Sequence, residues 1–224
     1  MATLRESLQE AESVDTCGMP GLSEWYDQLG QDVRQYADNM WPDVTHWAQM
    51  QWALRMASET WWLSSQIEIK LYLALMRRYI REMTNYPKDA CLLPNKRLSA
   101  LSEFLAEKGH KRFFGRGDVD YEIDIFLYLD CSLANVPGKG LIRYPFWVAV
   151  DCDGHEFHER TKWQAMKDRR KDRALMRSGL KFVRFTGAEI TLNADQCVMQ
   201  IEQLRNTHIL EFERLARLAT GAEP

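Results

Sequence analysis

Two aspartates stand two residues apart directly after an apolar run of the chain. Asp151 and Asp153 follow Phe146–Val150, and a continuous apolar run of this kind is typical of a strand buried on both faces. Side chains at i and i+2 of a strand share a face. Repulsion between the two carboxylates would therefore raise the pKa of one of them unless a cation lies nearby. Hard oxygen ligands suit Mg²⁺ or Mn²⁺. The pattern favours a divalent-metal site over two acids that merely end a strand in water.

A further carboxylate, Asp124, lies inside a segment with a period of two. Apolar residues alternate from Ile123 to Leu129, which predicts a strand. A carboxylate from each of two adjacent strands makes a reasonable divalent-metal site. Asp130, at the end of the same segment, is better explained as a strand end that faces water.

Basic residues are concentrated between His155 and Phe185. This segment holds ten Lys and Arg against four Asp and Glu, an excess of six positive charges in a chain whose net charge is -3. Most of them fall on a predicted helix over residues 160–177. Two interpretations are open: a solvated helix face with i, i+4 charge pairs, or a surface that contacts nucleic-acid phosphates. The second interpretation assigns phosphate contacts to Lys162, Lys167, Arg169, Arg170, Arg173 and Arg177.

The remaining pattern predicts the elements that hold these residues. Pro and Gly residues predict a loop near residues 86–95 and a turn-rich insertion at 135–140. The fold class is α/β: a mixed central sheet of about four strands flanked by helices, in the order α-β-β-β-α-β, with an all-α N-terminal extension. In the N-terminal half we expect a mobile leader at 1–22 and a helical extension at 23–63 with a helix at 24–40. A helical pattern follows at 44–83, with a kink or a new start at Ser64 or Ser65. After it we expect a helix at 98–108, strands at 123–130, 146–150 and 181–185, and a final helix at 195–218.

Composition restricts the class of protein. Hydrophobic residues make up 46% and charged residues 27% of the chain, which is ordinary for a globular protein. Apolar runs fall short of the roughly 20 residues that cross a bilayer, and the N-terminus lacks a secretory signal. Five scattered cysteines form no CxxC pair, which fits reduced thiols rather than a zinc knuckle. We expect a cytoplasmic protein with no membrane partner.

Three segments together resemble a known superfamily. These are Asp151–Lys162 with its glycine turn and histidines, the Arg-rich segment Asp168–Leu175, and Val183–Ile190. In this order and spacing they resemble the PD-(D/E)XK (restriction-endonuclease-like) superfamily, and within it the very short patch repair endonucleases. The resemblance runs from Ile67 to roughly Leu210 and implies a nuclease domain over residues 64–218. It implies a DNA endonuclease that uses Mg²⁺ or Mn²⁺ and leaves a 5′-phosphate and a 3′-hydroxyl.

The resemblance also implies roles for single residues. Asp124 matches the first acid of the motif, and Asp151 matches the second, where relatives more often have Glu. The backbone carbonyl of Cys152 joins them as a metal ligand. The motif lysine falls at Asp153, which is a departure from the family pattern. Candidates to replace that lysine come from the following helix: Lys162, Lys167 and Lys171.

Other positions of the resemblance lie outside the strands. Glu68 matches an acid of the first helix that joins the metal, although a solvated helix residue explains it equally well. His158 is expected to act as a general base or to bind the scissile phosphate, while the role of His155 is open. Asp172 matches a helix position that braces the site.

Two functions without catalysis stay open beside the nuclease. The lysine-to-aspartate departure at Asp153 suits a nuclease-like fold that binds nucleic acid and no longer cuts it. The tryptophans at positions 41–62 suit an interaction protein whose N-terminal helices bind a partner or form a homodimer.

Overall fold

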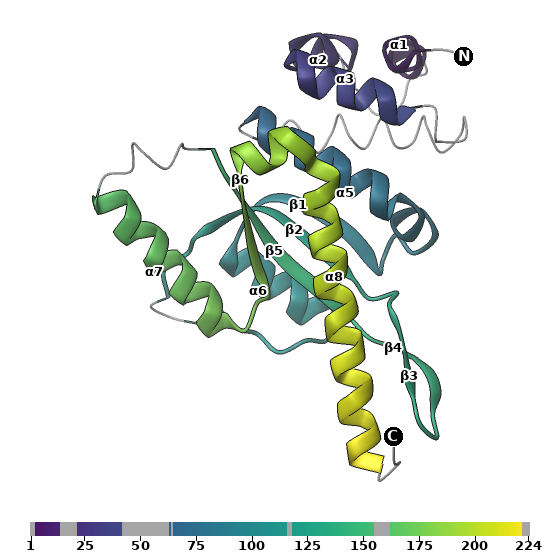
Figure 1. Cartoon of the computed structure of the whole chain (residues 1–224), viewed down its shortest axis with the longest axis vertical. Coiled ribbons are helices and arrows are strands. Elements are labelled where there is room, and N and C mark those ends of the chain that lie inside the picture. The colour runs from purple at the N-terminus through teal and green to yellow at the C-terminus, as the bar shows by residue number, and fades with distance from the viewer. Residues whose placement is uncertain are drawn as a thin grey trace.

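The computed structural model describes residues 3–13, 22–41, 63, 65–115, 118–154 and 162–220. Within these ranges helices and strands alternate after an all-helical start (Figure 1). In chain order the elements are α1 (Leu4–Ser13), α2 (Leu22–Gln28), α3 (Gln31–Met40), α5 (Gln66–Asn85), β1 (Ala90–Arg97), α6 (Leu98–Glu107), β2 (Glu122–Leu129), β3 (Leu133–Val136), β4 (Gly140–Arg143), β5 (Phe146–Asp153), α7 (Lys162–Ser178), β6 (Phe182–Thr186) and α8 (Gly187–Thr220).

The central sheet has four strands in the order β1-β2-β5-β6. β1 and β5 both pair antiparallel with β2, whereas β6 pairs parallel with β5. A parallel pair needs a crossover connection, and α7 lies within that connection. The expected mixed sheet of about four strands flanked by helices is confirmed. Taken without α6 and the β3–β4 hairpin, the order from α5 to β6 is α-β-β-β-α-β.

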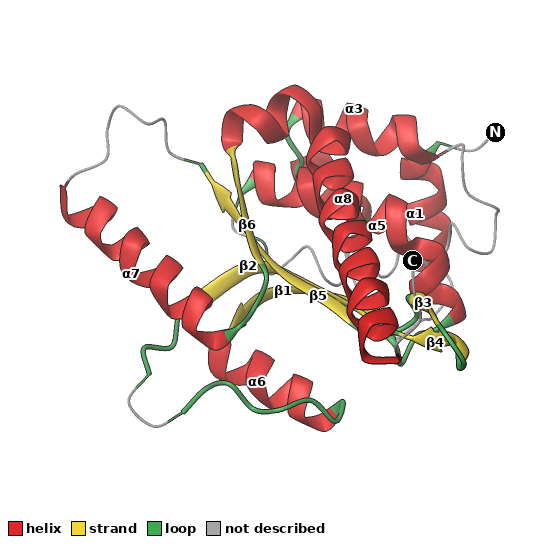
Figure 2. Ribbon diagram, turned by 60° about the horizontal axis from the view of Figure 1, so that its bottom comes forward, coloured by secondary structure: helices red, strands yellow, loops and turns green. Residues whose placement is uncertain are grey.

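Helices cover both faces of the sheet, as Figure 2 shows. One apolar core packs α5 and α8 against one face of the sheet, where it contains Leu127 of β2. A second core packs α6 and α7 against the other face, where it contains Phe126 of β2. Successive side chains of a strand point to opposite faces, which is why neighbouring residues of β2 enter different cores. The sheet is thereby held between two helical layers.

Three N-terminal helices extend the core on the side of α5. Leu4 and Leu8 of α1 are 1% and 0% exposed and belong to the same core as α5, so residues 4–13 are not the irregular leader that was expected. Their i, i+4 spacing places both side chains on one helix face. The helix expected at 24–40 is two helices, α2 and α3, separated at Gly30, whose N–H donates to the Gln66 side chain.

The first strand was missed by the sequence pattern, because residues 86–95 were expected to form a loop. β1 is an edge strand of the sheet, and Pro94 is tolerated there because an edge strand need not use every N–H group. Asn95 has φ of 45° and interrupts the β1–β2 ladder, since paired residues stand at Pro94 and Lys96 on either side of it.

Other boundaries also differ from the sequence pattern. Ser65 caps α5 by accepting the Glu68 N–H, which confirms the helix start expected at Ser64 or Ser65. The turn-rich insertion is part of the β3–β4 hairpin. α8 consists of two helices joined at the non-helical residue Asn193, whose Oδ1 accepts the Gln196 N–H. The second of them starts next to the expected Asp195, and the first, from Gly187, was not expected. In the described ranges no helix has the length and apolar character needed to cross a bilayer.

Candidate active site at the end of the sheet

Asp124 and Asp151 meet where β2 and β5 end their shared ladder. Ile125 is paired with Val150, and the two aspartates are the next residues outward on their strands. The backbone N–H of Cys152 donates to Asp124 Oδ2 over 2.6 Å. The sequence pattern therefore placed these acids correctly on neighbouring strands, and the sheet brings them together.

Asp151 is held by two cations. It is 5% exposed, and its Oδ1 lies 2.8 Å from Lys171 Nζ on α7. Its Oδ2 lies 3.1 Å from Arg184 Nη2 on β6, the residue paired with Asp151 across the parallel ladder. Arg184 Nη2 also lies 2.9 Å from Asp172 Oδ1. These charge-assisted bonds compensate the burial of the Asp151 carboxylate.

Glu68 approaches the same region from the first turn of α5. It is 7% exposed, so it is not the solvated helix residue that was one of its two interpretations. The start of α5 is fixed by Ile67, whose Cδ1 lies 3.4 Å from the positions that a Cβ would occupy on Gly154 and Gly187. A Cβ at either glycine would therefore be in van der Waals contact with Ile67, which shows that α5 packs against the ends of β5 and β6.

The acids affect one another's titration. Burial raises the pKa of Asp124 to about 7, and the negative charge of Asp151 adds to the rise. The Cys152 N–H and the Lys171 charge act in the opposite direction, while Glu68 raises this pKa further. Burial also raises the pKa of the Cys152 thiol, with Asp124, Glu68 and Asp151 contributing. Negative charge is therefore in excess around the Cys152 backbone.

The donor chemistry of this region suits a hard divalent cation. Carboxylates are the ligands that Mg²⁺ and Mn²⁺ prefer, and a cation would relieve the repulsion that raises the pKa of Asp124. Among the described residues, no three His, Cys, Asp or Glu side chains are grouped closely enough to form a ready-made metal cage. The acids thus fit the cation in type and charge without forming a preassembled set of ligands.

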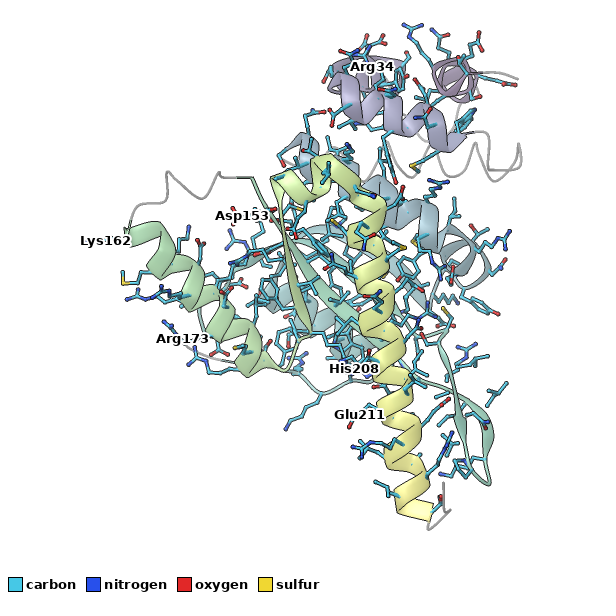
Figure 3. All side chains as sticks on the ribbon, viewed as in Figure 1. Arg34, Asp153, Lys162, Arg173, His208 and Glu211 are labelled. Carbon is cyan, nitrogen blue, oxygen red and sulfur yellow. The ribbon has the colours of Figure 1, made fainter. Side chains whose placement is uncertain are left out.

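The other candidate residues differ in how close they lie to the two aspartates. Asp153, paired with Thr186 at the end of β5, is partly exposed (Figure 3). Of the three candidate lysines, Lys171 contacts an acid of the site, whereas Lys162 and Lys167 are exposed on α7. His155 and His158 lie outside the described residues.

Two residues of this region received no role from sequence reasoning. Arg184 lies inside the apolar segment Phe182–Phe185, and a cation in such a strand is costly to bury without a partner. That cost is the signal by which it could have been found. Asn95 stands at the position opposite Asp124 in the β1–β2 register, and only its left-handed φ of 45° marks it.

Comparison with known proteins found no match for this chain among family models, curated proteins or solved structures.

Proposed function

We propose that this chain is a metal-dependent endonuclease that hydrolyses phosphodiester bonds of DNA. Its restriction-endonuclease-like core would be formed by α5, β1, β2, β5, α7 and β6. The observation that carries the proposal is the position of Asp124 and Asp151 on neighbouring strand ends, with Lys171 in contact with Asp151 and the charge of Glu68 acting on Asp124. The motif resemblance and the α-β-β-β-α-β order support it.

The acids would hold the metal ion. Asp124, Asp151 and Glu68 supply carboxylate oxygens, and the Cys152 carbonyl follows directly after Asp151 on β5. Bound Mg²⁺ or Mn²⁺ would supply charge stabilisation for the phosphate and lower the pKa of a water molecule.

Lys171 would take the part of the lysine that the motif lacks at Asp153. Its ammonium is fixed 2.8 Å from Asp151 Oδ1, which places a positive charge beside the acids. A cation fixed in advance stabilises charge that develops on an attacked phosphate. Arg184 and Asp172 are positioning residues, since Arg184 bridges Asp151 and Asp172 and so orients the Asp151 carboxylate.

The exposed basic residues of α7 would bind the DNA backbone. Contacts to phosphates position a protein on DNA without reading its sequence. Within the described part of the chain, Arg170 and Arg173 form no hydrogen bond or ion pair through their guanidinium groups, which leaves both groups able to meet phosphates.

The test is cleavage of supercoiled plasmid, single-stranded DNA and RNA with Mg²⁺, with Mn²⁺ or with EDTA. We expect cutting of DNA that requires the metal and is lost in Asp124→Asn and in Lys171→Met. Glu122→Gln, an exposed change on the same strand as Asp124, is the matched control and should cut like the wild type. Wild-type protein that binds DNA but never cuts it would refute the nuclease.

A DNA-binding protein without cleavage is the second candidate. Both carboxylate oxygens of Asp151 are already engaged, by Lys171 and by Arg184, which favours a closed ion-pair network over an open metal site. DNA affinity that falls steeply with salt, with no cleavage and no effect of Asp124→Asn on binding, would support this candidate.

A further inference from the structure

A cavity of about 390 Å³ lies between α7 and the segment that leads into β2. Arginines Arg170, Arg173 and Arg177 line it from α7, and aromatic residues Phe113, Phe114 and Tyr121 line it from the other side. The volume is within the range of about 300–1,000 Å³ that is typical of small-molecule sites. The cavity is separate from the acids, because neither Asp124 nor Asp151 lines it.

The arginine wall brings three positive charges to a cavity whose lining holds one carboxylate, Asp118. The three arginines are exposed, and their spacing of i, i+3 and i+7 puts them on one face of α7. In the described ranges none of them is paired with a carboxylate, although Arg177 Nε donates to the Arg173 carbonyl oxygen over 3.3 Å. Figure 3 shows Arg173 on α7, the helix that also carries Lys171. Positive charges grouped in this way favour the binding of an anion.

The aromatic wall is held in place by hydrogen bonds. The Oγ of Ser102, which is 2% exposed, accepts the backbone N–H groups of Phe113 (3.0 Å) and Phe114 (3.1 Å). Asp120 caps the start of α6 by accepting from both the N–H and the hydroxyl of Ser99. Asp118 lines the cavity as well, and its Oδ2 accepts the Gly115 N–H over 2.8 Å. Phe113 and Phe114 are partly buried against the second core, so they present fixed rings.

We propose that this cavity binds one unstacked nucleotide of the nucleic acid that the proposed function engages. The base would stack on the aromatic wall and its phosphate would meet the arginine wall. Aromatic rings bind bases of any sequence because every base has a flat π face, and arginines along a groove follow the phosphates. The chemistry requires an anion with an aromatic part, which a nucleotide has and a phosphate alone does not.

The position of the cavity links it to the proposed nuclease site. Lys171 contacts Asp151 from α7, and Arg177 lies about 9 Å farther along the helix axis at 1.5 Å per residue. One strand could therefore pass the acids and place a neighbouring nucleotide in the cavity. Such a pocket favours single-stranded or locally opened DNA, because a paired base cannot reach it without leaving the stack.

The test compares two oligonucleotides of the same length by fluorescence anisotropy in EDTA. One is single-stranded oligothymidylate, and the other has the same phosphates with abasic sugars. We expect the wild type to bind the first about tenfold more tightly. Phe113→Leu combined with Phe114→Leu should remove that preference and leave binding of the abasic strand unchanged. Arg169→Gln, on the same helix but outside this cavity, is the matched control and should weaken both strands alike.

A second measurement uses the wild-type protein and does not depend on the variants folding. Oligothymidylate that carries 5-iodouracil is irradiated on the protein, and the cross-linked peptide is identified by mass spectrometry. We expect cross-links at Phe113, Phe114 or Tyr121. Cross-links only elsewhere, equal binding of the two strands by wild type, or a preference that survives the double change would each overturn the pocket. If the protein prefers the strand with bases but never cuts DNA, the proposed nuclease is refuted and the proposed nucleotide pocket stands. If the protein cuts DNA without that preference, only the pocket is refuted.

Discussion

Asp124→Asn is expected to stabilise the metal-free protein while it removes cleavage. The folded protein keeps the Asp124 carboxyl partly buried and beside Asp151, which raises its pKa from the usual 3.8 to about 7. Asparagine carries no charge, and its side-chain oxygen can still accept the Cys152 N–H that Asp124 accepts over 2.6 Å. The substitution therefore relieves the cost of a buried charge and keeps the hydrogen bond.

The size of the effect follows from the two pKa values. The unfolded chain releases the Asp124 proton from about pH 4, whereas the folded chain holds it until about pH 7. Wild-type stability therefore falls as pH rises across this window and levels off above it. Relative to the asparagine variant, the wild type should be less stable by about 2 kcal/mol at pH 5 and by at most about 4 kcal/mol at pH 8.

The measurement is urea unfolding of wild type and Asp124→Asn in EDTA across this pH range. Glu122→Gln serves as the matched control, because Glu122 is exposed two positions earlier on β2. We expect the difference between wild type and Asp124→Asn to grow with pH beyond any change in the control pair. A difference that is constant with pH, or that shrinks as pH rises, would refute the buried, charge-coupled description of Asp124.

The remaining predictions concern the cation, the lysine, the core and the basic helix. Mg²⁺ at 100 times its Kd should stabilise the wild type by about 2.7 kcal/mol and Asp124→Asn far less, as thermal unfolding would show. Lys171→Met should lose cleavage and cost roughly 1–3 kcal/mol of unfolding free energy, because it strips a partner from buried Asp151. Leu8→Ala should cost about 2–5 kcal/mol if α1 belongs to the core. Arg173→Gln should reduce the salt dependence of DNA binding by about one phosphate contact.

Strong periodic patterns predicted the core strands well. The alternation in β2 and the apolar run of β5 are local consequences of which faces are buried, so they can be read without tertiary information. β1 was missed because Pro94 and Asn95 are turn-forming residues in isolation. Only the edge position of β1 makes them compatible with a strand, and an edge position is a property of the whole sheet.

The candidate site shows the same division between local and tertiary information. The pair Asp124 and Asp151 was predictable, because the strand patterns place one acid on each of two adjacent strands. The choice of Lys171 over Lys162 and Lys167 was not, because it depends on which face of α7 turns towards β5. Arg184 was also left without a role, since its partner lies on the neighbouring strand and register is set by the assembled sheet.

Charge balance gives a physical reason why aspartate can stand at position 153 in a site of this kind. A lysine at the end of β5 would bring one positive charge, and α7 and β6 here bring two from other elements. Among the described residues, contacts with Asp151 or charge effects on Asp124 join four acids and two cations: Asp124, Asp151, Glu68, Asp172, Lys171 and Arg184. Fully ionised, these six carry two negative charges in excess, which is the charge of one divalent cation with opposite sign. Without the cation, protonation of Asp124 removes one of these two charges. The pKa of Asp124 is raised to about 7 first by burial and then by the charge of Asp151.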